Sequence, residues 1–333
     1  MTTYKAIHGK LVQSLASDPD SAAYEGQVWF NTTSSDYKTI VKVAGSWATG
    51  GSLNTARSSL AGAHQGTQTA GLGFGGTPYK NESEEYNGST WTEGDNLNTG
   101  RQDLKGAGTQ TAGLGFGGYK PGSNADETEE YDGTSWTESG DLNTGRRELA
   151  GCGTQTAGFA FAGQVTTDSA LAETYDGSTW TEVADLSTAR QEHAGALGTT
   201  TAAVCAGGGG TATANSETFN GTAWTEGNNL NAAKNSLGSF GSSTAGLVFG
   251  GGPALATVEF YDGTSWTEVG NISTGRHQSA GSGTGVLGLA FGGSTGSATG
   301  ATEEWDFTST LAAGAWASGT AMNTTRHAGS GTG

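Results

Sequence analysis

The chain has 333 residues and a formal net charge of −17, with 32 acidic residues against 15 basic ones. This balance disfavours wrapping nucleic acid or docking on anionic lipid, because both require basic surfaces. The 59 glycines and only 4 prolines indicate turns between short strands rather than a disordered tract. The acidic charge favours solubility, and it would also attract divalent cations or basic partners.

The first ten residues, Met-Thr-Thr-Tyr-Lys-Ala-Ile-His-Gly-Lys, lack the apolar core of a signal peptide. No segment of the sequence is apolar over the length of a membrane span. We therefore expect synthesis in a cytoplasm, without membrane insertion. Cys152 and Cys205 occupy different places in the repeat described below, so we expect two buried free thiols rather than a disulfide.

A tryptophan followed ten residues later by a basic residue recurs along the chain, with successive tryptophans 42 to 50 residues apart. A fixed period in this range indicates a repeat fold. The pairs are Trp47/Arg57, Trp91/Arg101, Trp136/Arg146, Trp180/Arg190, Trp224/Lys234, Trp266/Arg276 and Trp316/Arg326.

One copy of the repeat contains four short apolar segments separated by turn residues. In the second copy we expect strands at residues 101–108, 113–118, 127–131 and 135–138. The Asp132-Gly133 dipeptide predicts a hairpin turn with positive φ at both residues. Four such strands form one blade, and a blade cannot bury both faces alone, so the copies should pack radially as a β-propeller.

The two ends of the chain together resemble a further copy. Residues 28–30, 39–43 and 44–47 match the last three strands, and residues 326–333 match the first. The sequence thus predicts an all-β, seven-bladed β-propeller with four antiparallel strands per blade, in which one blade is closed by both termini. The predicted propeller covers residues 25–333, after an attachment arm of residues 1–24.

The recurring order of arginine, double glycine, Glu-x-Tyr-Asp and tryptophan resembles the kelch repeat. The resemblance covers roughly residues 24–333 and implies a β-propeller, which in this family is mostly a binding platform and in a minority an enzyme. The third copy departs from the pattern with Ala162-Gly163 in place of the double glycine. The last copy has Trp305 in place of the tyrosine and an insertion at residues 309–315.

The N-terminal segment is similar to the opening of structural proteins of tailed phages of marine bacteria. The similarity is carried by Tyr-Lys-Ala-Ile-His-Gly at residues 4–9 and by Glu-Gly-Gln-Val-Trp-Phe-Asn-Thr-Thr-Ser at residues 25–34. It implies a non-enzymatic virion protein, such as a tail fibre, an appendage or a particle decoration. The arm would then bind other virion proteins, and the propeller would bind a glycan or protein of the host surface.

The basic residues of the repeat allow two interpretations. A ring of them at one mouth of the channel could bind an anion, or each could pair with a carboxylate and stabilise its blade. A glutamate two residues before the third-strand aromatic is available in each full copy, which favours the structural ring. The ring comprises Arg57, Arg101, Arg146, Arg190, Lys234, Arg276 and Arg326, and the glutamates are Glu84, Glu129, Glu173, Glu217, Glu259 and Glu303.

Positions that differ between copies are better candidates for recognition, since the framework does not fix them. They follow the basic residues and the double glycines, where loops on a rigid scaffold usually carry function. The candidate ligand-binding residues are Arg147, Gln191, Glu192, His193, His277, Gln278, Tyr79, Tyr119 and Lys120.

Catalysis and cofactors find little support in the sequence. His193 lies three residues after its basic residue, whereas His277 and His327 lie one residue after theirs, so we expect no metal site. No nucleophile or phosphate-binding motif is apparent. Two alternatives to a virion protein remain open. One is a cellular or secreted kelch-type scaffold that binds proteins, and the other is a carbohydrate-active or metal-dependent enzyme with acids or histidines clustered on one rim.

Overall fold

A computed structural model describes residues 13–16, 28–33, 36–39, 45–192 and 197–307 of the chain. The chain divides into two compact units, residues 44–308 and residues 1–43 together with residues 309–333. All regular elements in the described ranges are β-strands, so the all-β prediction is confirmed. No helix in these ranges is long and apolar enough to cross a membrane.

In its described residues the larger unit contains six four-stranded antiparallel sheets, each of them one blade, and a two-stranded sheet of β11 (Tyr119–Lys120) and β12 (Ser123–Asn124). Blades 1 and 2 comprise β5 (Ala61–Gly62), β6 (Gly71–Phe74), β7 (Ser83–Tyr86) and β8 (Trp91–Glu93), then β9 (Lys105–Thr109), β10 (Ala112–Phe116), β13 (Thr128–Tyr131) and β14 (Trp136–Glu138). Blades 3 and 4 comprise β15 (Ala150–Thr154), β16 (Ala157–Phe161), β17 (Ala172–Tyr175) and β18 (Trp180–Glu182), then β19 (Leu197–Thr199), β20 (Ala202–Ala206), β21 (Ser216–Phe219) and β22 (Trp224–Glu226). Blades 5 and 6 comprise β23 (Gly238–Ser242), β24 (Ala245–Phe249), β25 (Val258–Tyr261) and β26 (Trp266–Val269), then β27 (Ala280–Gly283), β28 (Leu287–Phe291), β29 (Thr302–Asp306) and β4 (Ser46–Gly50).

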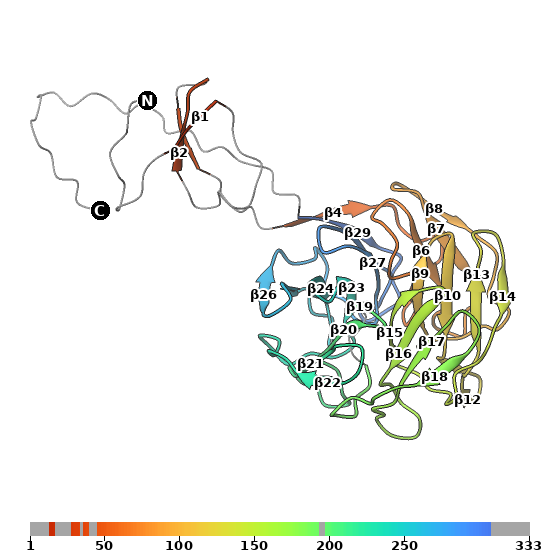
Figure 1. Cartoon of the computed structure of the whole chain (residues 1–333). Coiled ribbons are helices and arrows are strands. Elements are labelled where there is room, and N and C mark those ends of the chain that lie inside the picture. The colour runs from red at the N-terminus through yellow and green to blue at the C-terminus, as the bar shows by residue number, and fades with distance from the viewer. Residues whose placement is uncertain (1–12, 17–27, 34–35, 40–44, 193–196, 308–333) are drawn as a thin grey trace, which may run out of the picture. The chain divides into compact units, whose positions relative to one another are not determined.

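The blades follow one another around a ring in chain order (Figure 1). Their innermost strands contact each other in the closed cycle β5, β9, β15, β19, β23, β27 and back to β5. The ring is a β-propeller of six blades, so the expected four-stranded blades are confirmed and the expected seventh blade is wrong.

The error lies in how the ends of the chain pair. The strand that contains Trp47 is a fourth strand, as predicted, but it completes blade 6 by pairing with β29, where Trp47 lies opposite Trp305. The N-terminal side therefore closes the ring with an outermost strand. The expected closing strand at residues 326–333 lies outside the described residues.

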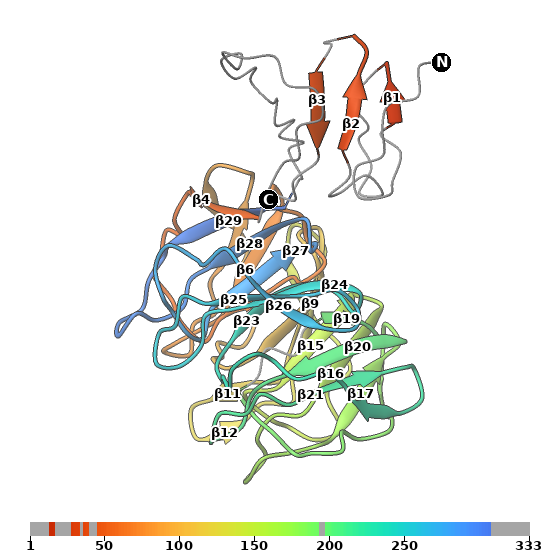
Figure 2. The ribbon, with the colours of Figure 1, turned by 90° about the vertical axis from the view of Figure 1, so that its left-hand side faces the viewer.

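Residues 28–30, predicted as the second strand of the seventh blade, belong to a separate sheet, as does Thr39, whereas the rest of the predicted third strand at residues 40–43 lies outside the described residues. This three-stranded sheet comprises β1 (Gln13–Leu15), β2 (Val28–Asn31) and β3 (Asp36–Thr39) (Figure 2). Strand β1 pairs with β2 in parallel, and β2 pairs with β3 in antiparallel. Strands β2 and β3 belong to the smaller unit, and the larger unit spans residues 44–308.

The apolar core of the propeller lies between neighbouring blades. The ring of Phe74 in blade 1, for example, packs 4.7 Å from the indole of Trp136 in blade 2. A Cβ atom on Gly115 would approach Phe74 to 2.8 Å, so this glycine lets an aromatic ring lie directly on the next blade. The same alternation of glycine and large apolar residues explains how a glycine-rich sequence still forms a dense core.

The turns between the third and fourth strands differ from the predicted type. Only the glycine has positive φ, as at Gly133 with φ +89°, whereas Asp132 does not. The Asp132 carboxylate instead accepts 2.8 Å hydrogen bonds from the backbone N–H groups of Thr134 and Ser135. The aspartate thus stabilises a longer loop through its side chain, as Asx turns do.

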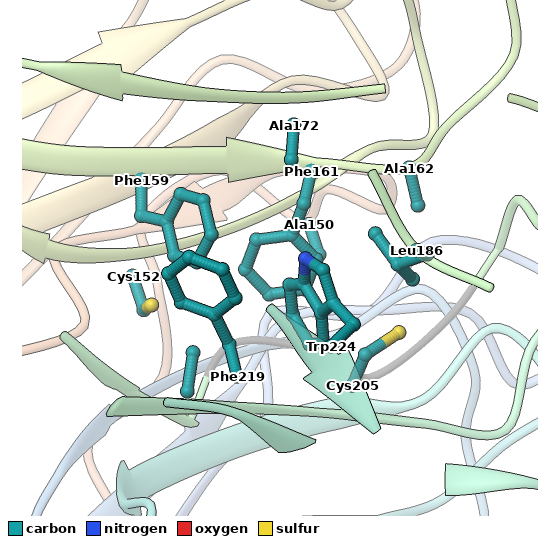
Figure 3. Packing of buried hydrophobic residues seen from close by; sticks show 11 residues of the cluster. Ala150, Cys152, Phe159, Phe161, Ala162, Ala172, Leu186, Cys205, Phe219 and Trp224 are labelled. Carbon is teal, nitrogen blue, oxygen red and sulfur yellow. The ribbon is translucent and has the colours of Figure 1, made fainter. Parts of the chain in front are cut away.

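The two cysteines are free and buried, as the sequence predicts. Cys152 and Cys205 belong to an apolar cluster between blades 3 and 4 that also contains Phe159, Phe219 and Trp224 (Figure 3). Burial raises the pKa of Cys205 to about 12, so its thiol stays protonated at neutral pH.

Candidate binding face

The repeated basic residue forms a buried ion pair in each of the six blades. Neither partner is more than 4% exposed in any pair. The pairs are Arg57–Glu84 at 2.7 Å, Arg101–Glu129 at 2.8 Å, Arg190–Glu217 at 2.6 Å, Lys234–Glu259 at 2.6 Å, and the close contacts Arg146–Glu173 and Arg276–Glu303. Arg326 lies outside the described residues.

Each glutamate of these pairs also binds the connection that enters its blade. Glu84, for instance, accepts a 2.6 Å hydrogen bond from the backbone N–H of Asn54. The guanidinium of Arg57 additionally donates to the carbonyl oxygen of Glu82 at 2.5 Å. Because each basic residue is paired with a glutamate inside its blade, the geometry agrees with the structural interpretation that the matched positions favour.

A second ring lies two residues after each basic residue, at one mouth of the channel. These six residues have positive φ, between +46° and +56°, although none is glycine. Each backbone N–H donates to the carbonyl oxygen of the equivalent residue in the preceding blade, over 2.6 to 3.2 Å. The closed cycle is Ser59, Asp103, Glu148, Glu192, Ser236, Gln278 and back to Ser59.

The side chains of this ring make the mouth acidic on one side. Asp103, Glu148 and Glu192 lie on successive blades around a cavity that Lys105 also lines. Burial, together with the carboxylates of Glu192 and Asp103, raises the pKa of Glu148 to about 7, and Arg147 opposes the rise. The Glu192 carboxylate accepts hydrogen bonds from the side chains of Asn235 at 3.2 Å and Ser236 at 3.0 Å in the next blade.

The cavity inside this mouth is small, with a volume of about 40 Å³. That space suits a few water molecules, whereas pockets for small organic ligands measure about 300–1,000 Å³. Deeper in the channel, side chains from an insertion cross between blades. The segment from Arg57 to Ala70 is longer by two residues than its counterpart from Arg101 to Ala112.

This longer segment brings His64 and Gln65 into the channel. The buried His64 ring contacts the carbonyl oxygen of Gly241 in blade 5 at 3.1 Å, and Gln65 donates to that of Gly198 in blade 4 at 3.2 Å. Burial lowers the pKa of His64 to about 3, so the imidazole is neutral. His64 and Gln65 therefore lie in the channel and connect blade 1 to blades 5 and 4 through uncharged hydrogen-bonding groups.

Aromatic and basic side chains from three neighbouring blades meet on the outer face around the mouth. We call Tyr79, Tyr119 and Arg147 the aromatic face. The ring centres of Tyr79 and Tyr119 are 6.1 Å apart, and the Arg147 guanidinium lies 4.8 Å from the centre of the Tyr119 ring. Asn124 holds Arg147 there by accepting a 3.0 Å hydrogen bond. Tyr79 is 38% exposed and is, with Val286 and Leu287, one of three exposed large apolar residues in the described part of the chain.

The structure brings together only part of the predicted site. Tyr79, Tyr119 and Arg147 are in contact, while Glu192 and Gln278 lie in the ring at the mouth. Lys120 is held by an ion pair with Glu127. Gln191 and His277 each keep a buried side-chain atom without a hydrogen-bond partner among the described residues. His193 lies outside the described residues.

Asp103 and Glu148 belong to the varying positions that follow the basic residues, which the sequence predicts around the channel mouth, and the structure places both in the ring there with Glu192. The sequence indicates the insertion at His64 and Gln65, because the segment from Arg57 to Ala70 is longer than its counterparts in other copies. Among the described residues, no three His, Cys, Asp or Glu side chains lie together as metal ligands would. Comparison with protein-family models and with curated proteins gave no match.

Proposed function

We propose that this chain is a non-enzymatic binding protein of a phage particle, in which the aromatic face contacts a host-surface glycan or protein. The observation that carries the proposal is the contact of Tyr79, Tyr119 and Arg147 across three blades. Tyrosine and arginine are the residue types that contribute most often to binding hot spots. Their fixed positions reduce the entropy lost when a partner binds.

The dimensions of the mouth favour surface recognition over catalysis in a pocket. A cavity of about 40 Å³ is too small for a sugar or nucleotide. The carboxylates around this cavity either accept hydrogen bonds within the ring, as Glu192 does from Ser236, or lie in a confined space. A ligand would therefore rest on the aromatic face above the mouth rather than enter the channel.

The placement of this module on a virion rests on the N-terminal sequence. Residues 25–34 carry the similarity to phage structural proteins, and their strand β2 belongs to a unit apart from the propeller. We infer that this unit, which includes the predicted arm of residues 1–24, attaches the propeller to other virion proteins. We also infer that the blades are of kelch type. Support comes from the order of basic residue, double glycine, glutamate and tryptophan in the copies, with Ala162-Gly163 in place of the double glycine in blade 3.

Binding to arrayed bacterial surface glycans and to intact bacterial cells tests the recognition role. The Tyr79→Ala/Tyr119→Ala variant should bind at least about tenfold more weakly than the wild type, because it removes both rings of the aromatic face. The matched control is Thr137→Ala/Thr181→Ala, which changes exposed positions on outermost strands. Equal binding of both variants would contradict the proposal. Binding only to a cellular protein would favour a scaffold.

A further inference from the structure

Neighbouring blades are joined by a recurring set of three hydrogen bonds, and the set is complete at three seams. A tyrosine hydroxyl donates to a glutamate of the preceding blade, a tryptophan Nε1 donates to a hydroxyl, and a glutamine Nε2 donates to backbone carbonyls. Between blades 1 and 2 these are Tyr131 to Glu85 at 2.7 Å, Trp136 to Ser83 at 3.5 Å, and Gln110 to the carbonyl oxygens of Gly71 and Tyr86 at 3.1 and 2.9 Å. The set recurs between blades 2 and 3 through Tyr175, Trp180 and Gln155, and between blades 6 and 1 through Tyr86, Trp91 and Gln68.

The seam between blades 3 and 4 replaces the whole set with apolar packing. Phe219 stands at the tyrosine position, Ala172 at the hydroxyl position and Thr200 at the glutamine position. The rings of Phe159 and Phe219 lie 5.0 Å apart, and the seam is filled by the cluster with Trp224 (Figure 3). This seam exchanges polar contacts for apolar contacts and stays closed.

The seam between blades 4 and 5 also loses bonds of this set, and it is packed by an apolar cluster that includes Val204, Val248 and Trp266. Thr218 replaces the glutamate and Ser243 replaces the glutamine, although Tyr261 is still a tyrosine. Among the described residues, the buried Nε1 of Trp266 has no hydrogen-bond partner, and the same is true of the Nε1 of Trp224 at the seam between blades 3 and 4. A cleft of about 730 Å³ lies here, lined by Ala203, Thr218, Phe219, Glu226, Ser243 and Tyr261.

The residues that line the cleft include the equivalent of the carbonyl pair that Gln110 and Gln155 bind at the seams between blades 1 and 2 and between blades 2 and 3. Ala203 pairs with Phe219 in the same register as Gly71 with Tyr86, the two residues whose carbonyls receive Gln110. The side chain of Ser243 is too short to reach the carbonyl oxygens of Ala203 and Phe219, which a glutamine at this position would reach. Among the described residues, no side chain donates a hydrogen bond to either carbonyl oxygen. This part of the cleft therefore offers backbone acceptors to a donor from outside the chain.

We propose that this cleft binds the guanidinium group of an arginine side chain on a basic partner protein. A guanidinium has five N–H donors in a plane and no acceptor, so it can donate to both carbonyls at once, as the Nε2 of Gln110 does at its seam. Glu226 on the cleft wall and the net charge of −17 favour a cationic donor over a neutral amide. The volume is within the range of small-ligand sites, unlike the mouth cavity. The site lies between blades 4 and 5 and stands independently of the aromatic face.

The test uses the full chain and three blocked tripeptides, Gly-Arg-Gly, Gly-Gln-Gly and Gly-Lys-Gly, with methyl glucoside as a neutral sugar. Titration by calorimetry or NMR should show that the arginine peptide binds the wild type at least about tenfold more tightly than the glutamine peptide and the glucoside, and more tightly than the lysine peptide. Ser243→Gln places the missing glutamine in the cleft and should weaken binding of the arginine peptide at least about tenfold.

Two further variants separate loss of the site from loss of the fold. Thr200→Gln introduces the same side chain at the neighbouring seam and should leave binding unchanged. Glu226→Gln keeps the shape of the cleft wall and should weaken the arginine peptide several-fold more than the glutamine peptide. The proposal is overturned by unchanged binding in Ser243→Gln, by preferred binding of the glutamine peptide or the glucoside, or by no binding of the arginine peptide at about 50 mM.

Discussion

The Oε1 atom of Glu129 accepts a 2.8 Å hydrogen bond from the guanidinium of Arg101, and both side chains are fully buried. The other oxygen of Glu129 accepts a 2.6 Å hydrogen bond from the backbone N–H of Asn98. One carboxylate thus ties the third strand of blade 2 to the connection from blade 1 and to the start of its innermost strand. Six copies of this pair fix the blades of the ring.

Arg101→Ala should lower the free energy of unfolding by about 3–5 kcal/mol, because it leaves the Glu129 carboxylate buried without its counter-ion. Arg101→Lys should cost clearly less, since blade 5 already uses Lys234 in a 2.6 Å pair with Glu259. Urea denaturation of the two variants measures the difference. Equal losses in both would contradict the importance of the buried charge pair.

Deleting residues 1–50 should lower the melting temperature by about 10 °C relative to deleting residues 1–43, because the longer deletion removes β4 and leaves blade 6 with three strands. It also removes Trp47, whose ring packs 5.9 Å from Phe249 of blade 5. Calorimetry of the two truncated proteins provides the comparison. The same melting temperature for both would show that β4 does not close the ring.

The raised pKa of Glu148 predicts a pH-dependent stability. Its carboxyl ionises at about 7 in the folded chain against an ordinary value of 4.5, so the folded state binds more protons between these values. The free energy of unfolding should therefore fall as the pH rises through this window. Glu148→Gln should raise the melting temperature at pH 8 and lose that advantage near pH 4.5. Glu138→Gln, on the exposed strand β14, is the control. If Glu148→Gln raises the melting temperature equally at both pH values, the raised pKa of Glu148 is refuted.

Thr218→Glu should restore a tyrosine–glutamate bond at the seam between blades 4 and 5. Three other seams contain this bond, as between Tyr175 and Glu130 at 2.6 Å. We expect a gain of about 1 kcal/mol in the free energy of unfolding, the usual net contribution of a hydrogen bond. In Tyr261→Phe/Thr218→Glu the gain should disappear, since the donor is absent. If the gain in stability persists in this double variant, its cause is not the tyrosine–glutamate hydrogen bond.

The blades and their buried pairs could be predicted from the sequence because they are local and repeated. Each glutamate keeps a fixed spacing from the tryptophan and the arginine, so Arg101 and Glu129 could be matched without a structure. The blade count could not be read in this way. Nothing near Trp47 indicates that its strand pairs with β29, whose Trp305 lies opposite it, because that pairing depends on the curvature of the whole ring.

The candidate site was predictable only in part for a similar reason. Variation between copies identified Tyr79, Tyr119 and Arg147, but their mutual contact depends on the spacing of three blades. Asp103 and Glu148 occupy equivalent positions in their copies, so the sequence alone places them in one ring. The closure of that ring through backbone hydrogen bonds requires six blades.

Mass spectrometry of purified phage particles, from a culture in which this gene is expressed, tests the central claim most directly. The account predicts that peptides of this chain co-purify with the capsid and tail proteins through a density gradient, in fixed proportion to them. Abundant chain in the cell lysate and none in intact particles would contradict the virion assignment.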